Sequence, residues 1–228
     1  MWYAVSTRSK NMKRYKYIFF DLDGTLTHSH PGIYGCIRYA LKALGEPDPD
    51  ESVLRKCIGP SLMYSFTTYF GLSEERARLA TAKYRERYSV IGWQENGAID
   101  GAVEALKILR EKGFVLAMAT SKPKIYADQI AEKFGLSPYF HAQVGSGMDG
   151  SFPTKASVIK ECIRQLNANK DECLMVGDRE HDAEGAKEEG VDCALLKVGY
   201  AEDGEFERCK PEYVFNDFHD LLDMLLEK

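Results

Sequence analysis

Short apolar runs alternate with amphipathic stretches along most of the chain. The runs that are typical of strands buried on both faces are Tyr15–Phe20, Phe114–Ala119, His141–Val144, Cys173–Val176, Asp192–Leu196 and Tyr213–Phe215. Between most of them, apolar residues recur at a spacing near 3.6, as Val103, Leu106 and Leu109 do before a Gly stop at residue 113. A second such helix is opened by Thr154. Apolar strands joined by helices predict an α/β protein with a parallel sheet.

One segment breaks this alternation. Between residues 30 and 95 the pattern predicts helices only, over Ile33–Leu44, Glu51–Cys57, Ser61–Phe70 and Ser73–Val90. A crossover between parallel strands usually takes one helix, so several helices here indicate an inserted all-helical unit. We expect hinges near His28–Pro31 and Gln94–Gly97. The predicted organisation is an N-terminal tail over 1–14, an α/β core over 15–29 and 96–228, and a helical cap over 30–95.

Composition narrows the possible partners and the compartment. The chain has 228 residues, 30 Lys+Arg against 35 Asp+Glu, a formal net charge of −5 and a pI of about 5.6. Nucleic acid and anionic membranes bind basic surfaces, and no apolar run approaches the roughly 18–20 residues of a membrane span, so we expect neither partner. The six cysteines contain no CxxC pair, which favours reduced thiols and a cytoplasmic protein. An acidic surface is compatible with a monomer or a homodimer.

Chemically versatile side chains stand where predicted strands end or the next helix begins. They are Asp21 and Asp23, Thr120 and Ser121, Thr154 and Lys155, and Asp178 and Asp182. Because the carboxyl ends of parallel strands face one crevice, we expect these residues to converge there. Several carboxylates in one crevice repel each other unless a cation joins them, and Mg²⁺ is a hard cation that prefers oxygen ligands.

The remaining groups suit a phosphoryl group. Lys155, together with the hydroxyl and backbone N–H donors of Thr120 and Ser121, provides positive groups around one point. An aspartate placed against a phosphoryl group can serve as nucleophile. A second aspartate beside it can act first as an acid and then as a base.

These residues resemble the four ordered motifs of the haloacid dehalogenase-like (HAD) phosphohydrolases. The motifs here are DLDGTL at Asp21–Leu26, TSKP at Thr120–Pro123, Lys155, and GDREHD at Gly177–Asp182. The resemblance runs from about residue 15 to the C-terminus and includes the helical insert, which is similar to the C1 cap of the family. It implies a Rossmann-like core. The stretches IGPSL, YRERY and TKASVI resemble most the branch of phosphoglycolate phosphatases and 5′-nucleotidase-type phosphatases.

The resemblance also implies a reaction, namely Mg²⁺-dependent hydrolysis of a small phosphorylated metabolite through an aspartyl-phosphate. It assigns Asp21 as the nucleophile and Asp23 as the general acid and base. Thr120, with Ser121, is implied to hold the phosphoryl oxygens, and Lys155 to stabilise the aspartyl-phosphate. The expected substrate is 5′-nucleotide-like or phosphoglycolate-like.

The same resemblance implies the metal site. Mg²⁺ is expected on the Asp21 carboxylate, the backbone carbonyl oxygen of Asp23 and the Asp178 carboxylate. Asp182 is expected to support this group of ligands.

Some assignments stay open at this point. Arg55 and Gly59 are predicted to contact the substrate because they lie where the cap is expected to face the crevice. Lys160 is the nearest rival to Lys155 for the essential lysine. The acidic run Glu202–Glu207 is interpreted as a solvated loop. A phosphomutase with the same catalytic residues and a catalytically silent binding protein on the same fold remain as alternative functions.

Overall fold

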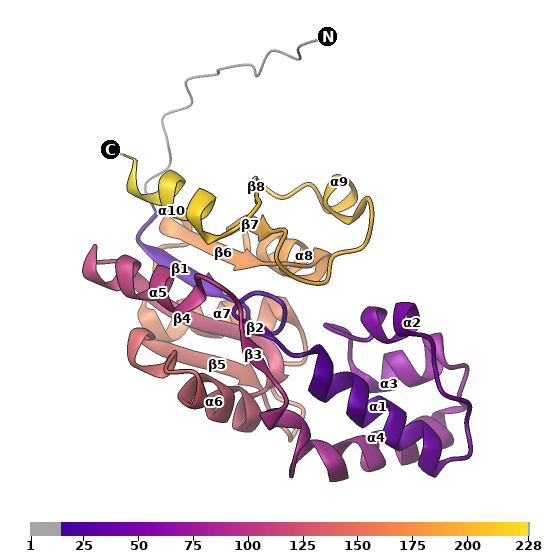
Figure 1. Cartoon of the computed structure of the whole chain (residues 1–228). Coiled ribbons are helices and arrows are strands. Elements are labelled where there is room, and N and C mark those ends of the chain that lie inside the picture. Colours follow the sequence, from indigo (N-terminus) through magenta and orange to yellow (C-terminus); the bar gives the residue numbers. More distant parts are fainter. Residues whose placement is uncertain (1–14, 228) are drawn as a thin grey trace.

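A six-stranded parallel sheet forms the centre of the α/β core (Figure 1). The computed structural model describes residues 15–227, so the predicted tail 1–14 lies outside the described residues. The order of the strands across the sheet is β5-β4-β1-β6-β7-β8. Their bounds are β1 Tyr17–Phe20, β4 Val115–Pro123, β5 Ala142–Ser146, β6 Cys173–Gly177, β7 Asp192–Leu196 and β8 Tyr213–Phe215. The six apolar runs therefore correspond to the six strands.

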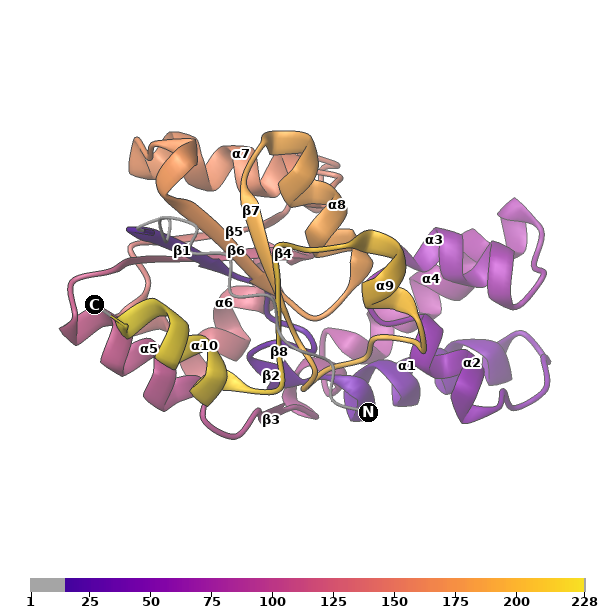
Figure 2. The same cartoon turned by 90° about the horizontal axis from the view of Figure 1, so that it is seen from above.

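Helices cover both faces of this sheet (Figure 2). On one face the hydrophobic core contains residues of α5 (Ala102–Glu111), α6 (Lys124–Lys133) and α10 (Phe218–Leu226). On the other face it contains residues of α7 (Lys155–Leu166) and α8 (Glu180–Glu189). This three-layer arrangement confirms the predicted Rossmann-like α/β fold.

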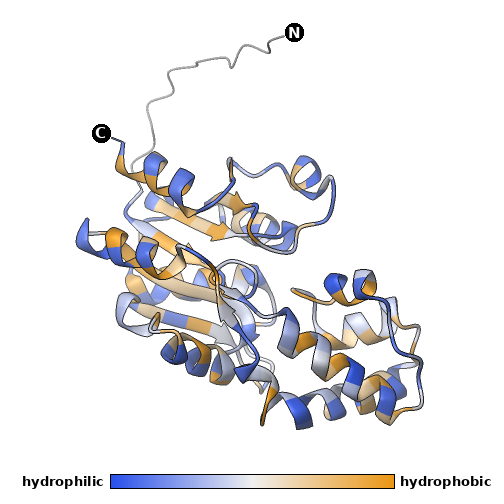
Figure 3. Cartoon of the chain, in the orientation of Figure 1, coloured by the Kyte–Doolittle hydropathy of each residue, from blue (hydrophilic) through white to orange (hydrophobic). Residues whose placement is uncertain are grey.

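Alternation along β1 explains why the sheet must be covered twice. Ile18 and Phe20 lie in one core cluster, and Tyr17 and Phe19 lie in the other. Neighbouring residues of a strand point to opposite faces, so an unbroken apolar run needs a helix layer on each side. Figure 3 shows the central strands largely in hydrophobic colours and the outer helices in mixed colours. None of the helices within 15–227 is both long and apolar enough to cross a membrane.

The segment that the sequence predicts as a helical cap, residues 30–95, contains helices and helical turns and no strand (Figure 1). Its elements are α1 His30–Ala43, α2 Glu51–Lys56, α3 Leu62–Tyr64, a π-helical turn at Ser65–Tyr69, α4 Glu74–Tyr88 and a 3-10 turn at Gly92–Gln94. These helices enclose a hydrophobic cluster of their own, centred on fully buried residues such as Ile37, Leu54 and Phe66. Tyr200 of the core packs into that cluster and so attaches the cap to the core.

The two chain segments that join cap and core lie side by side. Strands β2 (Thr27–His28) and β3 (Gly97–Ala98) form a short antiparallel ribbon, with Thr27 paired to Ala98. The backbone N–H of Gly32 also donates to the carbonyl oxygen of Glu95. The segments that sequence analysis predicted as hinges therefore overlap this paired connection.

One expectation about the fold is wrong. The run Glu202–Glu207, interpreted as a solvated loop, contains the start of α9 (Glu205–Cys209), and Glu205 is only 1% exposed. Its carboxylate accepts a hydrogen bond from the Arg179 guanidinium at 2.8 Å and others from the backbone N–H groups of Glu180 and Glu202. A carboxylate that accepts hydrogen bonds from a guanidinium and from two backbone N–H groups is stable in the interior. The acidic charge of the run alone did not indicate this burial.

Candidate active site

The predicted site residues gather at one edge of the sheet because the neighbouring strands β1 and β6 end there, with β4 alongside them. Phe20, the last residue of β1, is paired with Met118 of β4 and with Val176 of β6. Asp21 and Asp178 therefore follow neighbouring strands at nearly the same level. Lys155 begins α7, and Thr154 caps that helix by accepting a hydrogen bond from the N–H of Ser157. The predicted convergence is thus observed in the structure.

Three buried carboxylates stand close together at this edge. One oxygen from each of Asp21, Asp178 and Asp182 lies within 4.8 Å of the others. Asp178 accepts hydrogen bonds from the backbone N–H of Tyr200 at 2.7 Å and from the hydroxyl of Thr25 at 3.3 Å. Burial, together with repulsion from the two other carboxylates, raises the pKa of Asp178 well above its usual range. A cluster of this kind, built from oxygen donors alone, fits a hard divalent cation such as Mg²⁺.

Two glycines allow Asp178 to sit close to the turn that follows β1, in the DLDGTL motif. Gly24 has φ +89°, and a Cβ atom built on it would lie 2.4 Å from Oδ2 of Asp178. A Cβ atom on Gly199 would lie 2.0 Å from the same oxygen. Neither position has room for a side chain, so the glycine of the DLDGTL motif is required both for its backbone angle and for its lack of a Cβ atom.

Asp182 supports its neighbours through both of its oxygens. Its Oδ2 accepts hydrogen bonds from the backbone N–H groups of Asp178 and Arg179, each at 3.2 Å. Its Oδ1 lies 2.9 Å from the ammonium nitrogen of Lys155. Asp182 therefore fixes the backbone that carries Asp178 and the head of Lys155, while one of its oxygens remains within the carboxylate cluster.

Lys155 is buried among the carboxylates. Its Nζ lies 2.7 Å from Oδ1 of Asp21 and donates to the carbonyl oxygen of Ala119 at 3.0 Å. Burial disfavours its charged form, but the attraction of Asp182 and Asp21 is stronger and raises the pKa of Lys155 above its usual range. This lysine is therefore a permanent cation beside Asp21. The rival Lys160 is exposed on α7.

A second buried lysine, Lys122, was not assigned a role from the sequence. Strand β4 continues through Pro123, beyond the expected end at Ala119. Lys122 consequently reaches Asp23, with Nζ 2.6 Å from Oδ2, and its ammonium group lies 5.1 Å from the centre of the Tyr88 ring. The available signal was its place within the TSKP motif, directly after an apolar strand.

A cavity of about 300 Å³ opens above these groups, between core and cap. Its end at the sheet edge is formed by Asp21, Asp23, Thr120, Ser121, Lys122, Lys155 and Asp182. Its cap end is formed mainly by apolar and aromatic side chains, among them Ile33, Leu62, Met63, Tyr84 and Tyr88, and Tyr126 of the core lies beside them. Arg85 and Arg179 also reach the cavity. A ligand in this space would touch the predicted site residues and the cap at once.

The two cap residues predicted to touch substrate have different positions. Gly59 lies in a turn that lines the cavity. Arg55 does not line it, because its guanidinium donates to the carbonyl oxygens of Gly199 and Ala201 and lies over the Tyr200 ring. Arg55 thus contacts the loop whose Tyr200 N–H holds Asp178, rather than the space above Asp21.

One family model and several known proteins match most of this chain. Residues 15–190 match the family model described as haloacid dehalogenase-like hydrolase. A 5′-nucleotidase of Pseudomonas aeruginosa is 38% identical over 212 residues, which cover 93% of this chain and 96% of the relative. Tyrosine-protein kinase PtkA of Mycobacterium tuberculosis is 38% identical over 183 residues, which cover 80% of this chain and 62% of the relative.

The fold comparison agrees with these matches. The crystal structure of a predicted phosphatase from Clostridium acetobutylicum superimposes with a TM-score of 0.89 at 38% identity, covering 94% of this chain and 100% of that chain. Phosphoglycolate phosphatases of Vibrio species are also similar, at 28–30% identity.

Proposed function

From the premise that the chain belongs to the haloacid dehalogenase-like hydrolase family and is a phosphoric monoester hydrolase, we propose a more specific reaction. The proposed enzyme depends on Mg²⁺ and cleaves a small phosphorylated metabolite. The reaction passes through an aspartyl-phosphate on Asp21. The observation that carries the proposal is the contact of Lys155 with Asp21, at 2.7 Å, on the floor of a cavity lined by Asp23 and Thr120. The Asp21 carboxylate, the Lys155 ammonium group and the hydrogen-bond donors of Thr120 therefore lie around one point at this end of the cavity.

In the proposed first step, a carboxylate oxygen of Asp21 attacks phosphorus and the bond to the leaving oxygen breaks. Asp23 gives its proton to that oxygen. In the second step Asp23 takes a proton from water, whose oxygen attacks phosphorus and releases inorganic phosphate and free Asp21. The position of Asp23 supports this role, because its Oδ2 is held by Lys122 while its Oδ1 has no hydrogen-bond partner among the described residues.

The charge on the phosphoryl oxygens requires fixed donors. Lys155 is held by Asp182 and by the carbonyl of Ala119, so its ammonium group needs little reorganisation during the reaction. Thr120 and Ser121 line the same end of the cavity and are proposed to donate to the phosphoryl oxygens. Asp21, Asp178 and the backbone carbonyl oxygen of Asp23 are proposed to hold Mg²⁺, near Asp182 in the carboxylate cluster. When bound, Mg²⁺ would neutralise charge on the phosphoryl group.

For the leaving group we favour a nucleoside over glycolate. A volume of about 300 Å³ lies at the lower end of the range for organic ligands and far exceeds the space that a glycolate group fills. Tyr84 and Tyr88 stack at 5.3 Å, and Tyr126 stands edge-on to Tyr88 at 5.1 Å, so the cavity is lined by a group of aromatic rings. Aromatic rings suit a planar nucleobase. The 5′-nucleotidase among the relatives supports the same choice.

The test is release of inorganic phosphate from a panel of esters in the presence of Mg²⁺. The panel comprises AMP, ribose 5-phosphate, 2-phosphoglycolate, phosphotyrosine and phenyl phosphate. We expect AMP to have the highest kcat/KM and the Asp21→Asn protein to release no phosphate above background. Full activity with excess chelator would contradict the metal requirement. An isomerised sugar phosphate without free phosphate would indicate a mutase instead.

A further inference from the structure

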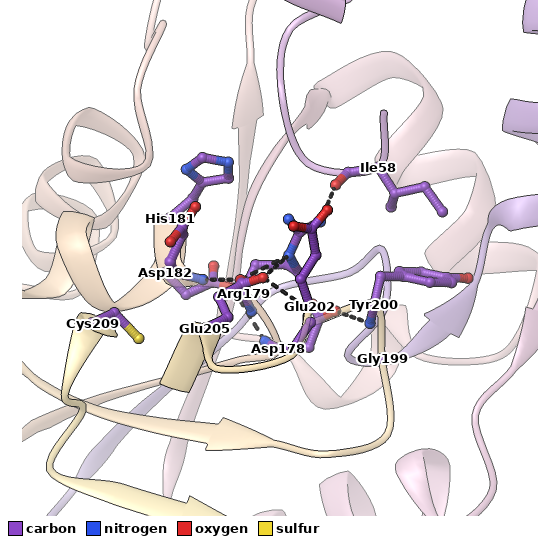
Figure 4. A network of polar contacts seen from close by, with 12 residues as sticks. Ile58, Asp178, Arg179, His181, Asp182, Gly199, Tyr200, Glu202, Glu205 and Cys209 are labelled. Atoms are coloured by element: carbon purple, nitrogen blue, oxygen red, sulfur yellow. Dashed lines mark hydrogen bonds and ion pairs between the residues drawn. The ribbon is translucent and has the colours of Figure 1, made fainter. Parts of the chain in front are cut away.

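Arg179 of the core forms a buried ion pair with Glu205, also of the core, and a hydrogen bond to Ile58 of the cap (Figure 4). Arg179 is 7% exposed, and its Nε donates to Oε1 of Glu205 at 2.8 Å. Its Nη1 donates to the carbonyl oxygen of Ile58, in the cap, at 2.7 Å. The three residues come from three separate parts of the chain, so this guanidinium contacts core, cap and cavity together.

Glu205 holds the guanidinium firmly in place. It is itself fixed by the backbone N–H of Glu180 at 2.6 Å and by that of Glu202 at 2.8 Å. Because an Arg–carboxylate contact is directional, Arg179 has little freedom to turn away from the cavity. A group fixed in advance in this way loses little conformational entropy when a ligand binds to it.

The hydrogen-bonding capacity of Arg179 exceeds what the protein uses. A guanidinium has five N–H donors, and within residues 15–227 the hydrogen bonds of Arg179 occupy one on Nε and one on Nη1. The second terminal nitrogen, Nη2, donates to no protein acceptor in that part of the chain. Arg179 also lines the cavity, where a ligand can accept from the remaining donors.

The cap turn that contains Gly59 lies next to Arg179. Gly59 follows Ile58 with φ +106°, and a Cβ atom on Gly59 would lie 3.9 Å from Nη1 of Arg179 and 3.4 Å from the His181 ring. The turn thus rests directly on Arg179. One side chain therefore both contacts the cap turn and carries the free guanidinium donors.

We propose that Arg179 is a specificity-determining residue, whose unused guanidinium donors bind an oxygen acceptor on the leaving group, such as a hydroxyl or carbonyl oxygen of a nucleoside. This rests on the proposed function for the identity of the reacting ester. It predicts that Arg179 selects leaving groups with such an acceptor against leaving groups without one. Phenyl phosphate is the matched probe, because apart from the ester oxygen its leaving group carries no acceptor.

The experiment measures equilibrium binding, so it does not depend on turnover. Calorimetry with Mg²⁺ gives the Kd of AMP and of phenyl phosphate for the Asp21→Asn protein and for the same protein with Arg179→Lys. A lysine keeps the charge but has a single nitrogen, which cannot serve Glu205, Ile58 and a ligand in fixed directions. We expect the Kd of AMP to rise by about tenfold or more relative to that of phenyl phosphate, as the loss of one hydrogen bond to a charged group predicts. Arg208→Lys, at an exposed arginine on α9, is the control and should change neither Kd.

An equal loss for both esters, or no loss for either, would overturn the proposal. If Arg179→Lys does not fold, the double variant Arg179→Gln with Glu205→Gln removes both buried charges together and is expected to show the same selective loss of AMP. Release of phosphate from AMP by the unaltered protein tests the proposed function separately. Binding selectivity that survives without any turnover would contradict the proposed function and not the role of Arg179.

Discussion

The ammonium nitrogen of Lys122 lies 2.6 Å from Oδ2 of Asp23, in an ion pair with side-chain exposures of 5% and 15%. Burial disfavours a charged lysine, yet the attraction of Asp23 dominates and raises the pKa of Lys122 above its usual range. Lys122 therefore stays protonated and fixes one oxygen of Asp23. The other oxygen, Oδ1, is buried and has no hydrogen-bond partner among the described residues, while Asp23 as a residue lines the cavity.

Replacing this lysine should damage catalysis more than binding. In Lys122→Met the carboxylate of Asp23 loses its partner and its fixed orientation, so proton transfer to the leaving oxygen becomes inefficient. We expect kcat to fall by about 10- to 100-fold, part of the roughly 10²–10⁴-fold that a positioned acid or base contributes. Steady-state kinetics with phenyl phosphate measures this. Lys122→Arg, which keeps the charge, should recover part of kcat, and an unchanged kcat in the Met variant would show that the ion pair is dispensable.

Asp21→Asn should abolish turnover while leaving the protein folded. The amide is a poor nucleophile and a poor metal ligand, and removal of a catalytic nucleophile costs about 10⁴-fold or more in kcat. In the unaltered protein, rapid quenching during turnover should trap a phosphoryl group on Asp21, located by mass spectrometry of peptides. Asp223→Asn, at an exposed position of α10, is the matched control with full activity. A label on Ser121 or on a histidine would contradict the mechanism.

The strands, the turn residues after them and the helix cap could be predicted from the sequence, because each depends on residues close together in the chain. Each buried strand is an apolar run, and the turn residues that follow, such as Asp21 and Asp178, lie at the same sheet edge because parallel strands share one direction. The Thr154 cap was also readable, because a Thr before an amphipathic pattern commonly accepts from the first helical turn. Hence the sheet, the helical content of residues 30–95 and the gathering of these side chains at one edge were predictable from the sequence, whereas their catalytic roles stay predictions.

Contacts between distant segments were not predictable in this way. Glu205 is buried because Arg179, far upstream, and two backbone N–H groups bind its carboxylate. Lys122 reaches Asp23 only because β4 continues further than its apolar run indicates. Arg55 lies beside the Tyr200 loop because of how the cap rests on the core. Composition gives no signal for any of these three placements.

Mg²⁺ should stabilise the fold, and more strongly at about pH 8 than at about pH 5. Burial and neighbouring carboxylates raise the pKa of Asp178 above its value in the unfolded chain. The folded protein without metal therefore binds more protons than the unfolded chain, and its stability falls as the pH rises from the unfolded pKa of Asp178 through the raised folded pKa. A bound cation relieves the repulsion among the three carboxylates. At low pH, protons compete with the cation for the same carboxylates. At about 100 times its Kd, Mg²⁺ should add about 2.7 kcal/mol. Thermal melts with Mg²⁺ and with chelator measure the shift in Tm, and an equal shift at both pH values would contradict this account.

Glu205→Ala should destabilise the protein strongly, although Glu205 lies outside the predicted catalytic motifs. The change leaves the Arg179 guanidinium buried without its counter-charge and removes the acceptor of two backbone N–H groups. Breaking one side of a buried ion pair costs about 3–5 kcal/mol. Urea unfolding gives the free energy directly. Glu207→Ala, at an exposed position of the same helix, should cost little, and equal effects of the two changes would show that the buried contact contributes nothing.

Tyr126 should distinguish a nucleotide from a sugar phosphate. It lies on α6 of the core, lines the cavity and stands edge-on to Tyr88 of the cap at 5.1 Å, so a planar base in the cavity can pack against both rings. Contact between a base and an aromatic side chain is worth about 1–3 kcal/mol, which corresponds to about tenfold in affinity or more. Tyr126→Leu keeps an apolar side chain but removes the ring.

We therefore expect kcat/KM of the Leu variant for AMP to fall by about tenfold, while kcat/KM for ribose 5-phosphate, which has no base, stays near its original value. Tyr39→Leu, on α1 and outside the residues that line the cavity, is the control for loss of a tyrosine from the molecule. Equal losses for both substrates would mean that the ring holds the cap or the cavity in shape rather than a base. No loss for either would place the leaving group away from this aromatic end, and the preference for a nucleoside would then have no structural support.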